Sequence, residues 1–101
     1  MPQFIKVITS DKVFDQRGTL VRIGGEDIAN FRRDGKYYAV GNVCAHQHFS
    51  MLHQGMLDGL TVTCPMHGWT YNLCDGLSTT GQGRVKTFPV KLIGDDVFVE
   101  V

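Results

Sequence analysis

Two cysteine–histidine pairs restrict the fold of this chain more than any other part of its sequence. One residue separates Cys44 from His46, two separate Cys64 from His67, and 17 residues lie between His46 and Cys64. Thiolates and imidazoles together suit zinc or an iron–sulfur cluster far better than magnesium or calcium. Each pair follows a predicted strand, so we expect two loops that clasp one metal centre from opposite sides.

Short β-type runs dominate the rest of the sequence. Several of them alternate apolar and polar residues as a half-buried strand does, and no long stretch shows the helical period. Glycine accounts for 12 of the 101 residues, above its usual share of about 7%, which indicates many tight turns. The sequence therefore predicts an all-β protein with one antiparallel domain over residues 1–101. The expected strands are residues 4–8, 19–23, 27–32, 36–40, 60–63, 69–73, 85–93 and 97–101.

Two turns and two irregular stretches complete the predicted topology. Asp34 and Gly35 stand between two strand-like runs, a combination that favours a type I′ hairpin turn. Residues 94–96 are expected to turn the chain inside a closing hairpin. The β pattern stops over residues 44–59 and again over residues 76–84. Loops held between regular strands are where a functional site is expected.

Composition and charge exclude several classes of protein. Ten lysine and arginine residues balance ten acidic residues, whereas a nucleic-acid binder of this size usually has a basic excess. No apolar run approaches the roughly 20 residues that a membrane span needs, and the N-terminus lacks signal-peptide features, so we expect a cytoplasmic protein. The three cysteines are an odd number, which makes a disulfide framework a poor explanation for them.

The two pairs and their surroundings resemble the Rieske family, whose pattern is Cys-x-His followed further along by Cys-x-x-His. The resemblance extends beyond the four residues and covers nearly the whole chain. Residues 64–76 are similar to the second cluster loop of Rieske ferredoxins, and residues 55–59 and 88–90 also match. The resemblance implies the Rieske fold, in which small antiparallel sheets stack and the cluster lies at the tip of two loops.

The resemblance also implies a [2Fe–2S] cofactor and a role for each of the four residues. Cys44 and Cys64 would hold the inner iron, and His46 and His67 would hold the outer iron near solvent. Two neutral imidazoles in place of two thiolates reduce the negative charge, so that adding an electron costs less Coulomb energy. Rieske potentials accordingly span about −150 to +300 mV, against about −400 mV for plant-type ferredoxins.

A zinc module is the alternative for the same four residues, because two cysteines and two histidines also form a zinc set. Zinc fingers, however, pair cysteine with cysteine and histidine with histidine, with about 12 residues between the pairs. Here each loop supplies one residue of each type, which favours the cluster.

Four further positions indicate what kind of Rieske protein this chain resembles. Respiratory-chain members link the two loops by a disulfide, and the matching positions here are Phe49 and Met66. Trp69 occupies the position of a serine that donates a hydroxyl in those high-potential proteins. Tyr71 matches their tyrosine, whose hydroxyl can donate to a cluster sulfur and raise the potential. We expect a potential low in the Rieske range that Tyr71 raises; packing alone is the alternative role for this side chain.

The free ferredoxin is the family member that fits these observations best. We expect a monomeric electron carrier, with no substrate chemistry and no membrane anchor, that passes single electrons from a flavin-dependent reductase to a terminal oxygenase. Two alternatives stay open: the small subunit of an NADH-dependent nitrite reductase, bound to its large subunit, and a redox-sensing module. Because some nitrite reductase small subunits lack the ligands, the intact set of four favours the ferredoxin.

The other residues near the motifs have simpler interpretations. We expect His48 and His53 to be exposed loop histidines, and Cys74 to be a surface thiol outside the ligand set. Phe49 and Met66 would form an apolar docking patch for a transient partner if both side chains were exposed.

Overall fold

The computed structural model of this chain describes most of the sequence in six stretches. Their regular structure consists of short antiparallel strands and two 3-10 turns of three residues each. No helix in these stretches is long and apolar enough to cross a membrane. The described residues are 3–14, 17–23, 25–43, 52–65, 69–79 and 83–100.

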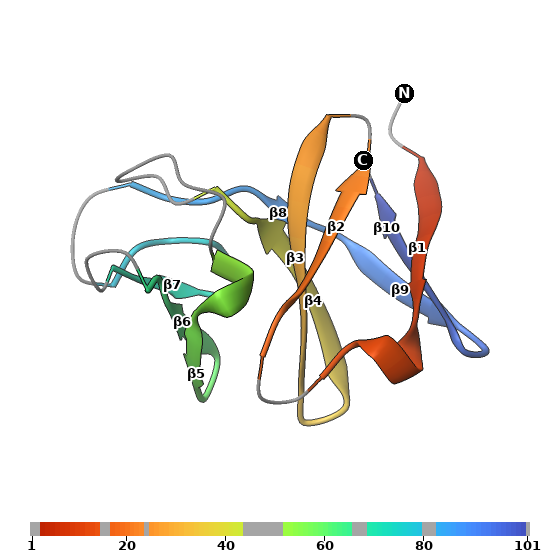
Figure 1. Cartoon of the computed structure of the whole chain (residues 1–101), viewed down its shortest axis with the longest axis horizontal. Coiled ribbons are helices and arrows are strands. Elements are labelled where there is room, and N and C mark those ends of the chain that lie inside the picture. Colours follow the sequence, from red (N-terminus) through yellow and green to blue (C-terminus); the bar gives the residue numbers. More distant parts are fainter. Residues whose placement is uncertain are drawn as a thin grey trace.

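The strands form three small antiparallel sheets, with the four-stranded sheet between the two three-stranded ones (Figure 1). The strand order is β2-β3-β4-β8 in the central sheet, β1-β10-β9 in the second sheet and β5-β6-β7 in the third. The elements are β1 (Phe4–Thr9), η1 (Ser10–Lys12), β2 (Thr19–Ile23), β3 (Glu26–Arg33), β4 (Lys36–Gly41), η2 (Leu52–Gln54), β5 (Met56–Asp58), β6 (Thr61–Thr63), β7 (Thr70–Asn72), β8 (Thr87–Phe88), β9 (Val90–Ile93) and β10 (Asp96–Glu100).

The central strand β3 supplies side chains to two separate cores, because successive residues of a strand point to opposite faces. Ile28 packs with Ala39 and Val99 on the face toward the second sheet. Ala29 and Phe31 point the other way, into a larger core shared with β6 and β7. This larger core consists of Ala29, Phe31, Val40, Leu52, Val62, Cys64, Tyr71, Leu73 and Val85.

The structure confirms the hairpins that local sequence signals predicted. Strand β2 has the expected bounds, and β3 and β4 differ from the prediction by one residue at their ends. Asp34 and Gly35 have φ values of 53° and 77°. A type I′ turn requires positive φ at both central residues, so this geometry confirms the predicted turn.

The prediction of no strand over residues 44–59 was wrong, because β5 lies within that range. Its three residues pair with β6 in regular antiparallel register, from Met56 opposite Thr63 to Asp58 opposite Thr61. A strand of three residues is too short to show the alternation that identifies a half-buried strand, which needs four or more residues. Only the pairing with β6 reveals it.

The single strand predicted over residues 85–93 was also wrong, because the chain changes sheets at Pro89. Before the proline, β8 pairs with β4 of the central sheet, and after it β9 pairs with β10 of the second sheet. Proline cannot donate a ladder hydrogen bond, which makes it a natural place to leave a sheet. The closing hairpin is therefore β9–β10 alone, and β1 adds to it as a third strand.

Asn30 provides a test of the packing between the central and second sheets. Its side chain is 2% exposed, and neither of its polar atoms has a hydrogen-bond partner among the described residues. Burying such a group costs about 1–3 kcal/mol, so Asn30→Leu should raise the free energy of unfolding by about that amount. Urea unfolding with an unchanged slope measures the difference. The matched variant Asn30→Asp should lower stability, and a destabilised Asn30→Leu would show that the amide is satisfied.

Candidate metal centre

Strand β6 delivers Cys64 into the interior of the molecule. Val62 and Cys64 are two residues apart and point to the same face, and both have 0% of their surface exposed. Both belong to the larger core together with Tyr71 of β7. Of the two cysteines that the structure describes, neither is in a disulfide. A buried thiol that is not in a disulfide suits a cluster ligand, so the position fits the predicted role.

The second candidate loop is closed at its base by contacts between β6 and β7. The backbone N–H of Cys64 donates to the carbonyl oxygen of Trp69 over 2.7 Å. The hydroxyl oxygens of Thr63 and Thr70 lie 2.9 Å apart and share a hydrogen bond. These contacts hold the two ends of residues 64–69 together, as a loop that presents ligands requires.

The first candidate loop has ends that are also tied together. Strand β4 ends at Gly41, and the backbone N–H of Leu52 donates to the carbonyl oxygen of Asn42 over 3.1 Å. Asn42 and Leu52, the residues on either side of this segment (residues 43–51), are therefore held next to each other. Cys44 and His46 belong to this segment and lie outside the described residues, as do His67, His48, Phe49 and Met66.

The anchor points of the two loops lie next to each other. Gly55 follows the first loop closely, and a Cβ atom there would overlap the carbonyl oxygen of Thr63 and lie 2.8 Å from Cγ2 of Val62. Thr63 is the residue directly before Cys64. The fold thus starts both loops from neighbouring positions, which agrees with two loops that clasp one centre. Within the described ranges, no three histidine, cysteine or acidic side chains gather, as three of the four candidates lie outside them.

Trp69 and Tyr71 both pack into or against the larger core. Trp69 is partly buried against the larger core, and Tyr71 within that core has 0% exposure. In the strand register Tyr71 lies opposite Val62, two residues before Cys64. The tyrosine is therefore placed in the same core as the one candidate ligand that the structure describes.

Tyr71→Phe should lower the midpoint potential by about 40 mV, the one-electron equivalent of a hydrogen bond worth about 1 kcal/mol. The reason is that the hydroxyl is expected to donate to a cluster sulfur, and such donors raise the potential. Redox titration monitored by electron paramagnetic resonance gives the midpoint. Tyr38→Phe serves as the matched control, and it should leave the midpoint unchanged. If the midpoint potential of Tyr71→Phe is unchanged, the role of Tyr71 is limited to packing in the core.

His53 and Cys74 were both expected at the surface, and only Cys74 is there. Cys74 is exposed, beside Tyr38, whose pKa is raised by burial and then by this neighbouring thiol. His53 is half-buried, and burial lowers its pKa, while the carboxylate of Asp27 acts in the opposite direction. The imidazole Nδ1 lies 2.9 Å from Nδ2 of Asn42, a fully buried side chain. Sequence reasoning missed Asn42, and its place two residues before Cys44 was the only signal.

The sequence profile of the Rieske [2Fe-2S] domain matches residues 3–91 of this chain. The chain belongs to the Rieske [2Fe–2S] family. Its cofactor is accordingly the Rieske-type [2Fe–2S] cluster, which is bound by two cysteines and two histidines in this family. The family assignment confirms the resemblance and the cofactor that the sequence predicted.

Ferredoxin components of dioxygenase systems are among the relatives of this Rieske protein. The ferredoxin component of the naphthalene 1,2-dioxygenase system from Pseudomonas aeruginosa is 31% identical over 83 residues, which cover 80% of this chain and 79% of the relative. Such components carry electrons and leave the catalysis to other subunits. The chain is an electron-transfer protein of this ferredoxin type.

Solved structures of Rieske proteins have the same fold. A chain in the complex of reduced oxygenase and oxidized ferredoxin in carbazole 1,9a-dioxygenase superposes with a TM-score of 0.84 and 28% identity, covering 94% of this chain and 99% of that one. A structure named as an NADH-dependent nitrite reductase small subunit from Mycobacterium tuberculosis has a TM-score of 0.92 and 22% identity, covering 100% and 96%. These superpositions confirm the predicted Rieske fold.

Proposed function

We propose that this Rieske protein receives single electrons from a flavin-dependent reductase and passes them to a terminal oxygenase. The observation that carries the proposal is the similarity to ferredoxin components over most of their length, including a chain from a complex with an oxygenase. Such a carrier needs no substrate pocket and no acid–base pair. It needs a cofactor near the surface and a fold that keeps that cofactor in one position.

We propose Cys44, His46, Cys64 and His67 as the ligands of the cluster. Support comes from Cys64, which is fully buried at the end of β6, and from the neighbouring anchor points of the two loops. When bound, the cluster supplies a centre that takes up and releases one electron. The two histidines would each bind iron through one ring nitrogen and keep the other available to hold a proton, so that their proton affinity depends on the redox state.

The residues of this chain would limit the reorganisation that accompanies electron transfer. The larger core packs apolar side chains around Cys64 and excludes water from that side of the site. The contacts between Cys64 and Trp69 and between Thr63 and Thr70 hold the second loop at both ends. A site that is already held in position needs little rearrangement when its charge changes.

The test is an electron paramagnetic resonance spectrum and a redox titration of the protein purified without air. We expect a rhombic signal in the reduced state, with an average g value below that of all-cysteine [2Fe–2S] centres. The midpoint should lie between about −150 and +300 mV. A zinc-containing protein without this signal would contradict the proposal, as would a midpoint near the about −400 mV of plant-type ferredoxins.

The partner is tested separately from the cofactor. Reduced protein should be reoxidised by an oxygenase in the presence of its substrate, and it should elute as a monomer without a tightly bound large subunit. Stable co-purification with a nitrite reductase large subunit would instead favour the alternative predicted from the sequence. The likeness to the small subunit from Mycobacterium tuberculosis is a likeness of fold, since the identity is 22%.

A further inference from the structure

Asn42 uses every polar group that it has to join segments on either side of the first cluster loop. Its backbone N–H donates to the carbonyl oxygen of Asp27 over 2.8 Å, and its carbonyl oxygen accepts from Leu52 over 3.1 Å. Its side-chain Oδ1 accepts from the backbone N–H of His53 over 2.5 Å. The side chain is 0% exposed, so each of these bonds is protected from competition by water.

The remaining side-chain contact of Asn42 defines the state of His53. The imidazole Nδ1 lies 2.9 Å from Nδ2 of Asn42 and 3.2 Å from its Oδ1. Because Oδ1 already accepts from the backbone N–H of His53, we assign the shorter contact, the one with Nδ2, to Nδ1. An amide nitrogen can only donate, so Nδ1 accepts in this assignment, and the ring proton is on Nε2. Protonation of Nδ1 would oppose two donors and break this contact. Burial disfavours the imidazolium as well and lowers the pKa of His53.

His53 is itself held by the central sheet. Its carbonyl oxygen accepts from the backbone N–H of Gly18 over 3.1 Å. A Cβ atom on Gly18 would lie 2.9 Å from Cα of His53 and 2.7 Å from the ring of Phe31, so no other residue allows the two segments to approach this closely. His53 therefore connects the end of the first loop to the start of β2.

Among the described residues, the charged groups around His53 do not offset the effect of burial on its pKa. Asp27 of β3 favours protonation, but it is paired with Arg22 of β2 over 2.9 Å. Arg17, beside Gly18, directs its guanidinium over the ring of Phe14, 4.6 Å from its centroid. Burial is the larger influence on the imidazole.

We propose that Asn42 and His53 form a positioning pair that holds together the two ends of the first cluster loop, residues 43–51, with His53 as the neutral Nε2–H tautomer. The proposal rests on the proposed assignment of Cys44 and His46 as ligands, because these two residues lie inside that loop. The pair touches neither ligand among the described contacts; it acts through the backbone that carries them. Its role is to keep the loop closed so that the ligands stay in place through the redox cycle.

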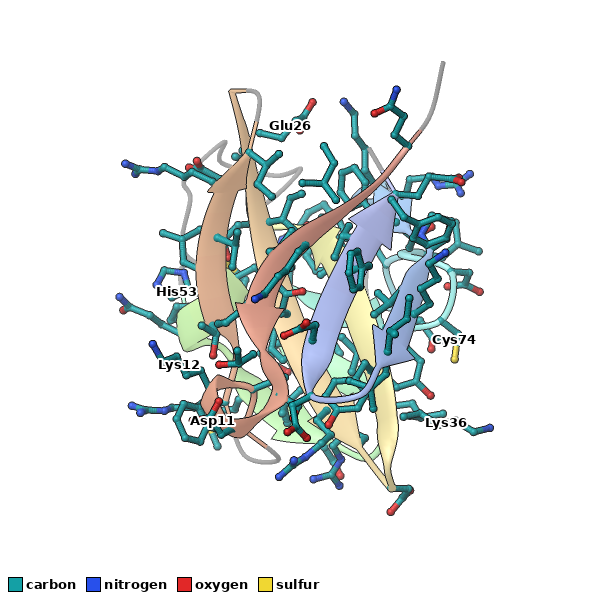
Figure 2. All side chains as sticks on the ribbon, turned by 90° about the vertical axis from the view of Figure 1, so that its right-hand side faces the viewer. Asp11, Lys12, Glu26, Lys36, His53 and Cys74 are labelled. Atoms are coloured by element: carbon teal, nitrogen blue, oxygen red, sulfur yellow. The ribbon has the colours of Figure 1, made fainter. Side chains whose placement is uncertain are left out.

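The test compares His53→Leu with His53→Asn in the cluster-bound protein. Leucine removes the acceptor, whereas the side-chain oxygen of asparagine can replace Nδ1. We expect His53→Leu to release its cluster to an iron chelator about 2- to 10-fold faster than the wild type, the factor that one hydrogen bond provides. His53→Asn should release it at nearly the wild-type rate. Cys74→Ala is the control for an unrelated surface change, since Cys74 lies on the opposite side of the molecule from His53 (Figure 2).

A pH series separates positioning from general stability. In the wild type, release should accelerate as the pH falls below about 6.5, the ordinary pKa of histidine, because protonated His53 cannot accept from Asn42. The His53→Asn variant has no titrating group at this position. Its cluster release should therefore accelerate less at low pH than that of the wild type. An identical pH profile in the two proteins would overturn the proposed tautomer.

Amide hydrogen exchange gives a readout that does not depend on the cluster. Residues 52 and 53 donate their backbone N–H groups to Asn42, so their exchange should become about 2- to 10-fold faster in His53→Leu, while β10 stays unchanged. Equal acceleration in both segments, or no acceleration in either, would overturn the positioning role. A wild-type protein without a Rieske signal would overturn the ligand assignment, and the exchange at residues 52 and 53 would still decide whether the pair closes the loop.

Discussion

Cys64→Ala should abolish the [2Fe–2S] cluster, with iron, inorganic sulfide and the electron paramagnetic resonance signal all falling to background. The reason is that the thiol is the proposed ligand and sits in a fully buried position where no other group can replace it. Alanine is close to cysteine in size, so the loss of packing in the larger core is small. Metal analysis and the spectrum of the reduced protein measure the effect, and circular dichroism reports whether the sheets are retained.

Cys74→Ala is the matched control for this prediction. Cys74 is the other cysteine that the structure describes, and it is exposed rather than buried. The Cys74→Ala protein should keep its full content of cluster and an unchanged midpoint potential. A Cys64→Ala protein that still binds the cluster, or a Cys74→Ala protein that loses it, would show that the ligand set is wrong.

Gly76→Ala should lower the free energy of unfolding by about 2–5 kcal/mol, a large part of the stability of a domain of this size. Gly76 has a φ of 75°, a left-handed conformation that costs other residues about 1–2 kcal/mol. A Cβ atom there would also overlap the backbone carbonyl oxygen of Val85 and lie 3.1 Å from Cγ2 of Thr87. Overpacking of this kind typically adds about 1–3 kcal/mol. Thermal unfolding should show a midpoint lower by about 10 °C or more.

Gly94→Ala separates the two contributions to that loss. Gly94 also has a positive φ, of 61°, but a Cβ atom there would meet nothing within 4 Å. It should therefore cost only the conformational strain of about 1–2 kcal/mol. Equal losses in the two variants would mean that the chain near Val85 moves aside to accept the methyl group.

Local signals predicted the parts of the fold in which neighbouring residues decide the outcome. The alternation in β2, β3 and β4 needs only the period of a strand, and the turn at Asp34 and Gly35 needs only residues that tolerate positive φ. Both features are visible within a few residues of sequence. The Cys and His spacing is equally local, which is why the family and its cofactor followed from the motifs.

Local sequence signals could not predict which distant segments of the chain pair with each other. The three-residue strand β5 exists because β6 lies beside it. The chain changes sheets at Pro89 because the residues before the proline pair with β4 and those after it pair with β10. The contacts of His53 could not be predicted from local sequence either. Its sequence neighbours indicated an exposed loop, whereas Asn42 and Gly18 approach it only in the folded chain.

The sequence alone determined the all-β class, the candidate ligands and the Rieske family of this protein, because turn residues, strand period and ligand spacing are properties of short segments. Only the tertiary structure decided that Cys64 is buried in the same core as Tyr71, that the ends of the two loops lie next to each other, and that Asn42 and His53 are in contact. These features depend on contacts between residues far apart in the chain. Such contacts form only when three separate sheets pack together, and no local pattern encodes their geometry.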